Sequence, residues 1–283
     1  MMFLSFLKKL LLLLFISTLS TVAYSQKKLA PLPDKIDESS ALLCIGDSVF
    51  ITLNDSGNNP ELYVVNKKGE IINTSVIENA KNIDWEALAT DGRDRLFIGD
   101  IGNNKNNRTD LCIYIVSLQQ VLNDTSTWAE QLTFSYPDQE EFPPDVEELY
   151  YDAEAMIYRN DSLFIFTKNR TVPFDGKSKV YGLSLTQQHQ VAVSYLPIYL
   201  EKTNWLEDSV TDACLTDNTL FLLTYSKIYI FSVENNKYIK KDVVELKRST
   251  QVEGICYANG KLYLSDEKSI LGKQFLYELE YSK

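Results

Sequence analysis

Histidine is almost absent from this chain of 283 residues, which contains only His189. A single histidine therefore disfavours both a histidine-based catalytic triad and a histidine-rich zinc site. No two of the four cysteines have the Cys-x-x-Cys spacing that many zinc sites use. His189 lies in the polar segment 187–190, between two expected strands, and we expect it to be a surface residue without a catalytic role.

Positive charge is also scarce, since 28 lysines and arginines face 39 acidic residues and the net charge is −11. This excess of acid disfavours nucleic acid and anionic membranes as partners, and it is compatible with cations or basic partners. We expect a monomer that binds a small molecule, a glycan or a protein, and we expect no organic cofactor.

A long apolar run occurs once, at the N-terminus. Lys8 and Lys9 precede the apolar residues 10–16, and small and polar residues follow as far as Ser25. This order is typical of a secretory signal peptide, and the apolar core is too short to cross a bilayer. We therefore expect residues 1–25 to be removed and residues 26–283 to form an exported protein, in the periplasm, at the cell surface or outside the cell, without membrane insertion.

The four cysteines are Cys44, Cys112, Cys214 and Cys256. An even number in an exported chain is compatible with disulfides, but these residues are widely spaced and the protein is not small. Two interpretations are possible: at least one disulfide, or small buried thiols inside strands. The pairing is not predicted.

One two-strand pattern recurs along the chain: a polar residue, an apolar strand, a polar turn and a strongly β-forming strand. The five copies begin at Ser40, Glu86, Glu154, Asp212 and Glu253. Each copy is followed by a third strand with a tyrosine at the same place, which gives Tyr63, Tyr114, Tyr181, Tyr229 and Tyr277. Fourth strands are expected at 71–76, 131–136, 191–200 and 243–246.

The repeating unit is thus a four-stranded antiparallel sheet, which is typical of a propeller blade. We predict an all-β fold, a single β-propeller of five four-stranded blades in which an N-terminal strand within residues 28–36 completes the last blade and closes the ring. Six blades are the alternative if residues 110–151 hide a degenerate one. A two-sheet sandwich would not explain the repeat.

In such a blade the first strand lines the channel, and the second runs back beside it. The start of the first strand and the end of the second therefore lie at one mouth of the channel. We expect the five residues that begin the copies there, together with Asp55, Asp100, Lys168, Tyr225 and Asp266. Seven of these ten residues are acidic, and their charges would be relieved either by solvent or by a hard cation such as Ca²⁺. The expected metal ligands are Glu86, Glu154, Asp212 and Glu253.

Two loops, residues 54–59 and 99–104, share the spacing Asp-x-Gly-Asn. Such loops either make tight turns or present their amides and carboxylates to a ligand. Neighbouring basic groups either pair with the acids or hold an anionic or polyhydroxylated ligand. The expected ligand-binding residues are Asn54, Asp55, Asp84, Asp100, Asn103, Arg108, Lys168, Arg170 and Asp266.

Residues 54–58, 84–89 and 99–104, with Arg108, resemble motifs of a family of exported, mostly uncharacterised bacterial β-propellers that is common in Bacteroidota. This close resemblance covers about residues 50–110. More distantly, the whole repeat is similar to SdiA-regulated and NHL-type propellers, whose inner strands carry an acidic residue followed by Gly or Ala, as at Glu86 and Glu253. The resemblance implies an exported propeller, usually six-bladed among the distant relatives, and no particular activity.

Three functions fit these residues. A binding module would use the acidic mouth, with or without Ca²⁺, and needs no catalytic residue. A calcium-dependent hydrolase of lactones, phosphoesters or nucleotides would use Glu86, Glu154 or Glu253 as its base, and a glycosidase would use two of these three. Because the side chains of Trp85 and Glu86 leave a strand in opposite directions, Trp85 does not desolvate Glu86, which weakens the enzymatic case. Binding is our first hypothesis and the calcium-dependent hydrolase is the alternative.

Overall fold

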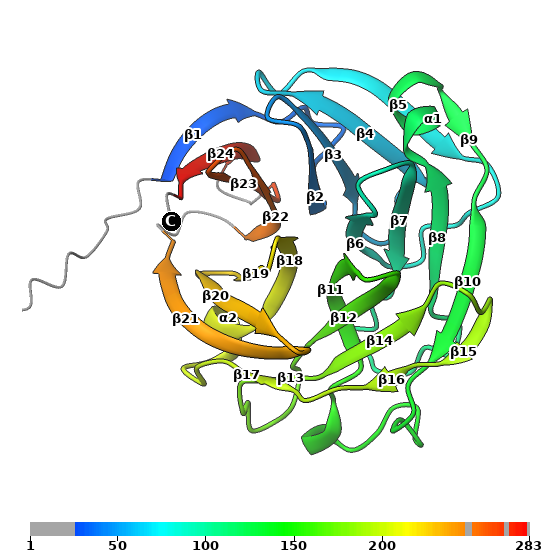
Figure 1. Cartoon of the computed structure of the whole chain (residues 1–283), viewed down its shortest axis with the longest axis vertical. Helices are drawn as coiled ribbons and strands as arrows, with labels where there is room; N and C mark the ends of the chain where they lie inside the picture. The colour runs from blue at the N-terminus through cyan, green and yellow to red at the C-terminus, as the bar shows by residue number, and fades with distance from the viewer. Residues whose placement is uncertain (1–25, 247–250, 269–271, 282–283) are drawn as a thin grey trace, which may run out of the picture.

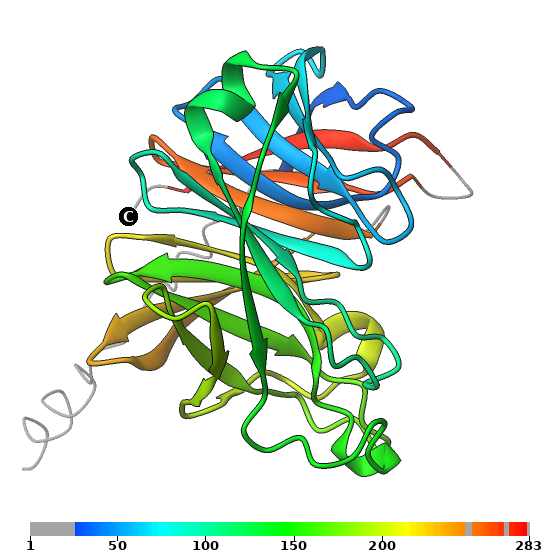
Figure 2. The same cartoon turned by 90° about the vertical axis from the view of Figure 1, so that its right-hand side faces the viewer.

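A computed structural model describes residues 26–246, 251–268 and 272–281, so the predicted signal segment 1–25 lies outside the described residues. Five sheets are arranged around a central channel, and one strand of each lies nearest the centre (Figure 1). Seen from the side, the sheets lie at an angle to one another, as blades do (Figure 2). The predicted five-bladed β-propeller is confirmed.

Blades 1 and 2 each have four antiparallel strands and one short strand added in parallel at the outer edge. Blade 1 consists of β2 (Ser39–Ile45), β3 (Val49–Asn54), β4 (Glu61–Asn66), β5 (Ile71–Ile77) and the added β9 (Ser126–Thr127). Blade 2 consists of β6 (Trp85–Thr90), β7 (Arg95–Asp100), β8 (Cys112–Ser117), β10 (Glu130–Ser135) and the added β15 (His189–Val191). The helix α1 (Leu118–Asn123) follows β8.

Blades 3 and 4 follow along the chain. Blade 3 consists of β11 (Asp152–Arg159), β12 (Ser162–Lys168), β14 (Val180–Ser184) and β16 (Val193–Ser194), with the separate pair β13 (Lys177–Ser178) and β17 (Ile198–Tyr199). Blade 4 consists of β18 (Val210–Thr216), β19 (Thr219–Thr224), β20 (Lys227–Glu234) and β21 (Lys237–Glu245). The short helices η1 (Val146–Glu148) and α2 (Trp205–Asp208) precede the inner strands of blades 3 and 4.

Blade 5 is built from both ends of the chain. It consists of β22 (Val252–Ala258), β23 (Lys261–Asp266), β24 (Phe275–Glu280) and β1 (Gln26–Pro31). β1 pairs antiparallel with β24, as predicted for the closing strand. A disulfide between Cys44 in β2 and Cys256 in β22 joins the inner strands of blades 1 and 5 at the same seam, while Cys112 and Cys214 are free thiols. This answers the question of pairing that the sequence left open.

Tight turns between strands follow from the local sequence. The two-residue loops Asn160-Asp161, Asn235-Asn236 and Asn259-Gly260 have positive φ at both positions. Such loops match the twist of a β-hairpin and favour Asn, Asp and Gly, which tolerate this conformation. The turns therefore fix the register of the hairpins to which they belong.

The core consists of five apolar clusters, one between each pair of neighbouring blades. Each cluster contains one of the five repeated tyrosines, all buried: Tyr63, Tyr114, Tyr181, Tyr229 and Tyr277. The repeated tyrosine thus marks the position in the third strand that faces the preceding blade. No helix in the described ranges is long and apolar enough to cross a membrane.

The outer edge of blade 3 differs from the prediction of one fourth strand over 191–200. This segment is divided among β15, which joins blade 2, β16, which joins blade 3, and β17, which pairs with β13. Long-range pairing of short polar strands has no local sequence signal, so the division was not foreseen. His189 lies at the exposed start of β15, where its Nδ1 is 2.5 Å from Thr133 Oγ1.

Candidate functional site

Every inner strand begins with a β-bulge, in which one residue has no partner on the second strand. A bulge bends the strand and re-aims the side chain of the extra residue. The five bulge residues are Ser40, Glu86, Glu154, Thr211 and Glu253. We call them the bulge row, and they lie where the inner strands begin, at the mouth of the channel.

The bulges correct the register that the sequence suggested. In blade 4 the bulge residue is Thr211, so the expectation that Asp212 stands in this row is wrong by one residue. Asp100 and Asp266 each pair with the residue just before the bulge of their own blade. Lys168 lies one position further along the second strand, because it pairs with Asp152, two residues before the bulge at Glu154. The position of Lys168 is taken in blade 5 by Glu267, which the sequence analysis missed.

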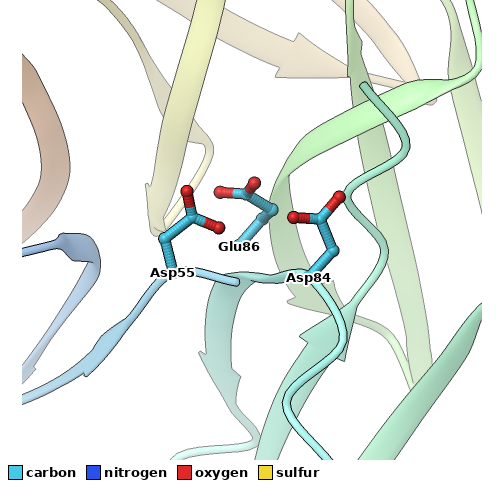
Figure 3. Close-up of side chains that lie close together, drawn as sticks. All are labelled: Asp55, Asp84 and Glu86. Carbon is cyan, nitrogen blue, oxygen red and sulfur yellow. The ribbon is translucent and has the colours of Figure 1, made fainter. Parts of the chain in front are cut away.

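Three carboxylates converge between blades 1 and 2, and we call Asp55, Asp84 and Glu86 the acidic cluster. One oxygen of each lies within 4.8 Å of the others. Asp55 follows β3, Asp84 precedes β6 and Glu86 is the bulge residue of β6, so two adjacent blades supply the cluster (Figure 3). Asp84 and Glu86 are only 7% and 3% exposed. The structure thus brings together residues that the sequence assigned separately to a ligand and to a metal.

The hydrogen bonds of the acidic cluster are incomplete. Ser40 Oγ donates to Glu86 Oε2 at 2.5 Å. Asp84 Oδ1 is buried, and no group in the described part of the chain donates a hydrogen bond to it. A buried carboxylate oxygen without a donor is costly, because it has lost water and gained nothing in return. Asp84 Oδ1 is therefore available to bind a ligand atom or a cation.

The loop after β7 packs directly against the acidic cluster. A Cβ atom at Gly102 would lie 2.5 Å from Asp84 Cγ and 2.8 Å from Glu86 Cγ. Only glycine allows the backbone to approach this closely. The loop therefore restricts the positions that the two side chains can take.

The electrostatics of the acidic cluster favour a bound proton or a cation. Burial, together with the charges of Asp55 and Asp152, raises the pKa of Asp84 to about 7. Burial, followed by the charges of Glu154 and Asp55, raises the pKa of Glu86 well above its ordinary value. The charge of Asp55 thus makes Asp84 and Glu86 harder to ionise, and a divalent cation would stabilise the charged form of both.

Blade 3 neutralises the glutamate at the same position. Lys168 Nζ lies 3.0 Å from Glu154 Oε1 and donates to Tyr225 Oη at 2.8 Å, while Arg170 Nη2 lies 3.8 Å from Glu154 Oε1. Burial opposes the charge of Lys168, but the charge of Glu154 holds the pKa of this lysine well above its usual range. Arg170 also pairs with Asp152. One ion-pair network thus contains Glu154, which was predicted to bind a metal, together with Lys168 and Arg170, which were predicted to bind a ligand.

Blade 5 contributes a second acidic pair. Gln251 Nε2 lies 3.3 Å from Glu253 Oε1 and 3.1 Å from Glu267 Oε2. Burial, followed by the charge of Glu253, raises the pKa of Glu267 to about 10. The two carboxyl groups therefore share one amide donor, and the raised pKa of Glu267 favours its protonated form.

The remaining predicted acids hold the mouth in shape. Asp212 accepts hydrogen bonds from the backbone N–H groups of Ala213, at 2.7 Å, and Ile255, at 2.8 Å, so it links the inner strands of blades 4 and 5. Asp100 accepts from Asp84 N at 3.1 Å and pairs with Arg108 at 2.9 Å. Neighbouring elements of the fold thus use the carboxylate of Asp212 and the Oδ1 atom of Asp100, while Asp100 Oδ2, like Asp84 Oδ1, is buried without a donor in the described part of the chain.

Asp266 and the predicted asparagines also make contacts within the fold. Tyr277 Oη and Phe275 N both donate to the carboxylate of Asp266, which ties β23 to β24. Asn103 donates to Tyr151 O at 3.1 Å and accepts from two N–H groups of its own loop. Asn54 Nδ2 donates to Lys35 O at 2.9 Å.

A groove opens beside the acidic cluster. Its cavity measures about 340 Å³, and Asp84 forms part of its wall. The other lining residues come from the loops after β3 and β7 and from the residue before Asp84; they are Ser56, Ile83, Asn103, Asn104, Lys105, Asn107 and Arg108. We call this cavity the side groove. A second cavity, of about 170 Å³, lies in the apolar channel among inner-strand residues, including Leu42, Met156 and Tyr257.

No model of a known protein family matches the chain, and no curated protein matches its sequence. Two solved structures align over nearly the whole chain. The glutaminyl cyclase of Myxococcus xanthus is 10% identical over 92% of this chain and 96% of its own, with a TM-score of 0.54. A luciferin-regenerating enzyme is 8% identical over 91% of this chain and 95% of its own, with a TM-score of 0.52. At these identities the similarity shows the fold alone, and the closer resemblance to an exported Bacteroidota family stays a prediction.

Proposed function

We propose that this β-propeller is an exported binding protein that holds Ca²⁺ at the acidic cluster and uses it to bind a ligand at the mouth. The observation that carries the proposal is Asp84 Oδ1, a buried carboxylate oxygen without a hydrogen-bond donor, set among three converging carboxylates. The Cys44–Cys256 disulfide supports export, because disulfides persist in oxidising compartments.

The chemistry and spacing of the acidic cluster suit Ca²⁺. This ion takes six to eight oxygen ligands at about 2.3–2.6 Å, so two ligands on opposite sides lie about 5 Å apart. The three carboxylate oxygens lie within 4.8 Å of one another and come from two blades. Three side chains fill only part of such a coordination sphere, which leaves positions for water and for oxygen atoms of a ligand.

A calcium-dependent hydrolase of lactones, phosphoesters or nucleotides is the second candidate. The pair of Glu253 and Glu267 favours it, because two carboxyl groups that share one amide donor, one of them with a raised pKa, are suited to acid–base chemistry. Against it, the buried ion pair with Lys168 occupies Glu154, one of the three predicted bases. Binding needs none of these groups to act as a base, so binding comes first.

The test is a thermal melt of the purified protein in EDTA and then in millimolar Ca²⁺. A ligand that binds only the folded state stabilises it, by about 2.7 kcal/mol at 100 times its Kd. For a domain of this size that corresponds to a rise in Tm of about 5–10 °C. We expect this rise for the wild type and no rise for Asp84→Asn.

The control is Asp47→Asn, which removes a carboxylate from an exposed turn of blade 1 and should keep the full rise. Asp84→Asn removes a repelling charge, so in EDTA it should melt at or above the wild-type temperature. A full Ca²⁺-dependent rise in Asp84→Asn would refute the site.

A further inference from the structure

The side groove carries groups that the fold does not use. In the described part of the chain no acidic side chain pairs with Lys105, which is exposed. Asn104 accepts a hydrogen bond from Arg170 through Oδ1, and within the described ranges neither its Nδ2 nor the side-chain amide of Asn107 is engaged. One short loop therefore offers an ammonium group and two amide donors to the same cavity.

The rest of the wall is held rigidly. Arg108 donates to Gly102 O at 2.7 Å and pairs with Asp100 and Asp110, at 2.9 and 3.0 Å. Asn103 is fixed by the hydrogen bonds described above. The free donors thus stand on a loop whose base is fixed, so a ligand would have to order their side chains but not the backbone that carries them.

The lining of the side groove limits the class of ligand. Among the described residues no aromatic side chain lines it and Ile83 is its one aliphatic residue, so these residues offer no stacking surface to a nucleobase or another flat ring. Amides, the Ser56 hydroxyl and an ammonium group suit hydroxyl groups and an anionic group. A cavity of about 340 Å³ accommodates a small molecule.

We propose that the side groove binds a small hydroxylated organic anion, a sugar acid or a sugar phosphate, with its anionic group at Lys105 and a ligand oxygen on the cation beside Asp84. This inference rests on the cation site proposed above. The charges agree with this orientation, because three carboxylates and one Ca²⁺ leave the cluster at about −1, while Lys105 contributes a positive charge to the lining of the groove.

The test is isothermal titration calorimetry of the whole protein in 2 mM Ca²⁺, with D-gluconate, D-glucose 6-phosphate and neutral D-glucose as probes. We expect at least one anion to bind ten-fold or more tightly than glucose, and the better of the two identifies a carboxylate or a phosphate as the anionic group. Lys105→Glu should weaken the binding of that anion ten-fold or more. Lys240→Glu, which changes an exposed lysine on the outer strand β21, should leave it unchanged.

The thermal shift with Ca²⁺ alone separates the two proposals. If Ca²⁺ still stabilises the protein but neither anion binds better than glucose, or if Lys105→Glu binds the anion as the wild type does, the groove proposal is wrong and the cation site stands. If Ca²⁺ has no effect on the wild type, the cation site fails, and the groove proposal fails with it.

Discussion

Glu86 and Glu154 occupy the same bulge position in adjacent blades, and both are 3% exposed. Glu154 has a lysine and an arginine within 4 Å. Glu86 has a serine hydroxyl and two further carboxylates. The same backbone feature thus builds an ion pair in blade 3 and a group of three acids in blade 2, and burial raises the pKa of both glutamates well above the ordinary value.

The difference arises at the end of the second strand and in the residues just after it. Blade 3 has Lys168 and then Asn169, and the lysine reaches Glu154. Blade 2 has Ile101 and then Gly102; Ile101 packs into the apolar cluster between blades 2 and 3, and Gly102 lets its loop close over Asp84. A buried acid on an inner strand is therefore no evidence of function by itself. The partners supplied by the neighbouring strand decide whether it is structural.

The largest expected effect comes from removing the cation of the structural pair. Lys168→Met would leave Glu154 buried without its closest partner, which should lower the free energy of unfolding by about 3–5 kcal/mol. Chemical denaturation at pH 7 measures this change. The double variant Glu154→Gln/Lys168→Met removes both charges and should recover most of the loss. A single variant within about 1 kcal/mol of the wild type would show that blade 3 does not depend on the pair.

The second prediction concerns pH in the absence of a cation. Folding raises the pKa of Asp84 to about 7, so the folded state holds a proton that the unfolded chain has already released. The stability from this proton is complete below about pH 4 and is lost as the pH rises through 7. In EDTA the free energy of unfolding should therefore fall by about 2 kcal/mol between pH 5 and pH 8.

Denaturation curves in EDTA at both pH values measure this loss. Asp84→Asn should reduce it, and saturating Ca²⁺ should oppose it, because the cation binds the ionised carboxylates. The prediction is wrong if the wild type in EDTA is more stable at pH 8 than at pH 5.

The smallest expected effect tests the loop that closes over the acidic cluster. The Cβ of Gly102→Ala would displace Asp84 and Glu86, and we expect the affinity for Ca²⁺ to fall about ten-fold, or about 1.4 kcal/mol. Gly272→Ala is the matched control, because nothing lies within 4 Å of a Cβ at that position. Calcium titrations of both variants provide the measurement, and equal affinities would mean that the loop does not shape the cluster.

Much of the fold was predictable because its signals are local. The hairpins and the repeated tyrosines are encoded in short stretches of sequence, and five copies of one pattern favoured five blades over six. The closing strand, expected within residues 28–36, is β1 at Gln26–Pro31. The Cys44–Cys256 pairing was not predictable, since 212 residues separate the two cysteines. The parallel addition of β15 to blade 2 likewise joins segments that are distant in the chain.

The candidate site was predictable only to within one residue. Asp212 was taken for the counterpart of Glu86, but the bulge in β18 falls at Thr211. A bulge adds one residue to a strand without a distinctive sequence, and a shift of one residue sends a side chain to a different environment. Glu267 was missed because of the same uncertainty of one residue. The sequence analysis placed its neighbour Asp266 at the mouth, but Asp266 pairs with Val252, before the bulge.

The disulfide has a mechanical consequence. The bond between Cys44 and Cys256 makes a covalent macrocycle of the chain between them, while β1, β23 and β24 lie outside it. Tension applied to the two ends of the chain would pass from one cysteine directly to the other and bypass everything in between. Tethering this protein by its termini would therefore load blade 5 and the part of β2 before Cys44, while the segments that carry the acidic cluster and the side groove, all within the macrocycle, would bear no tension along the chain.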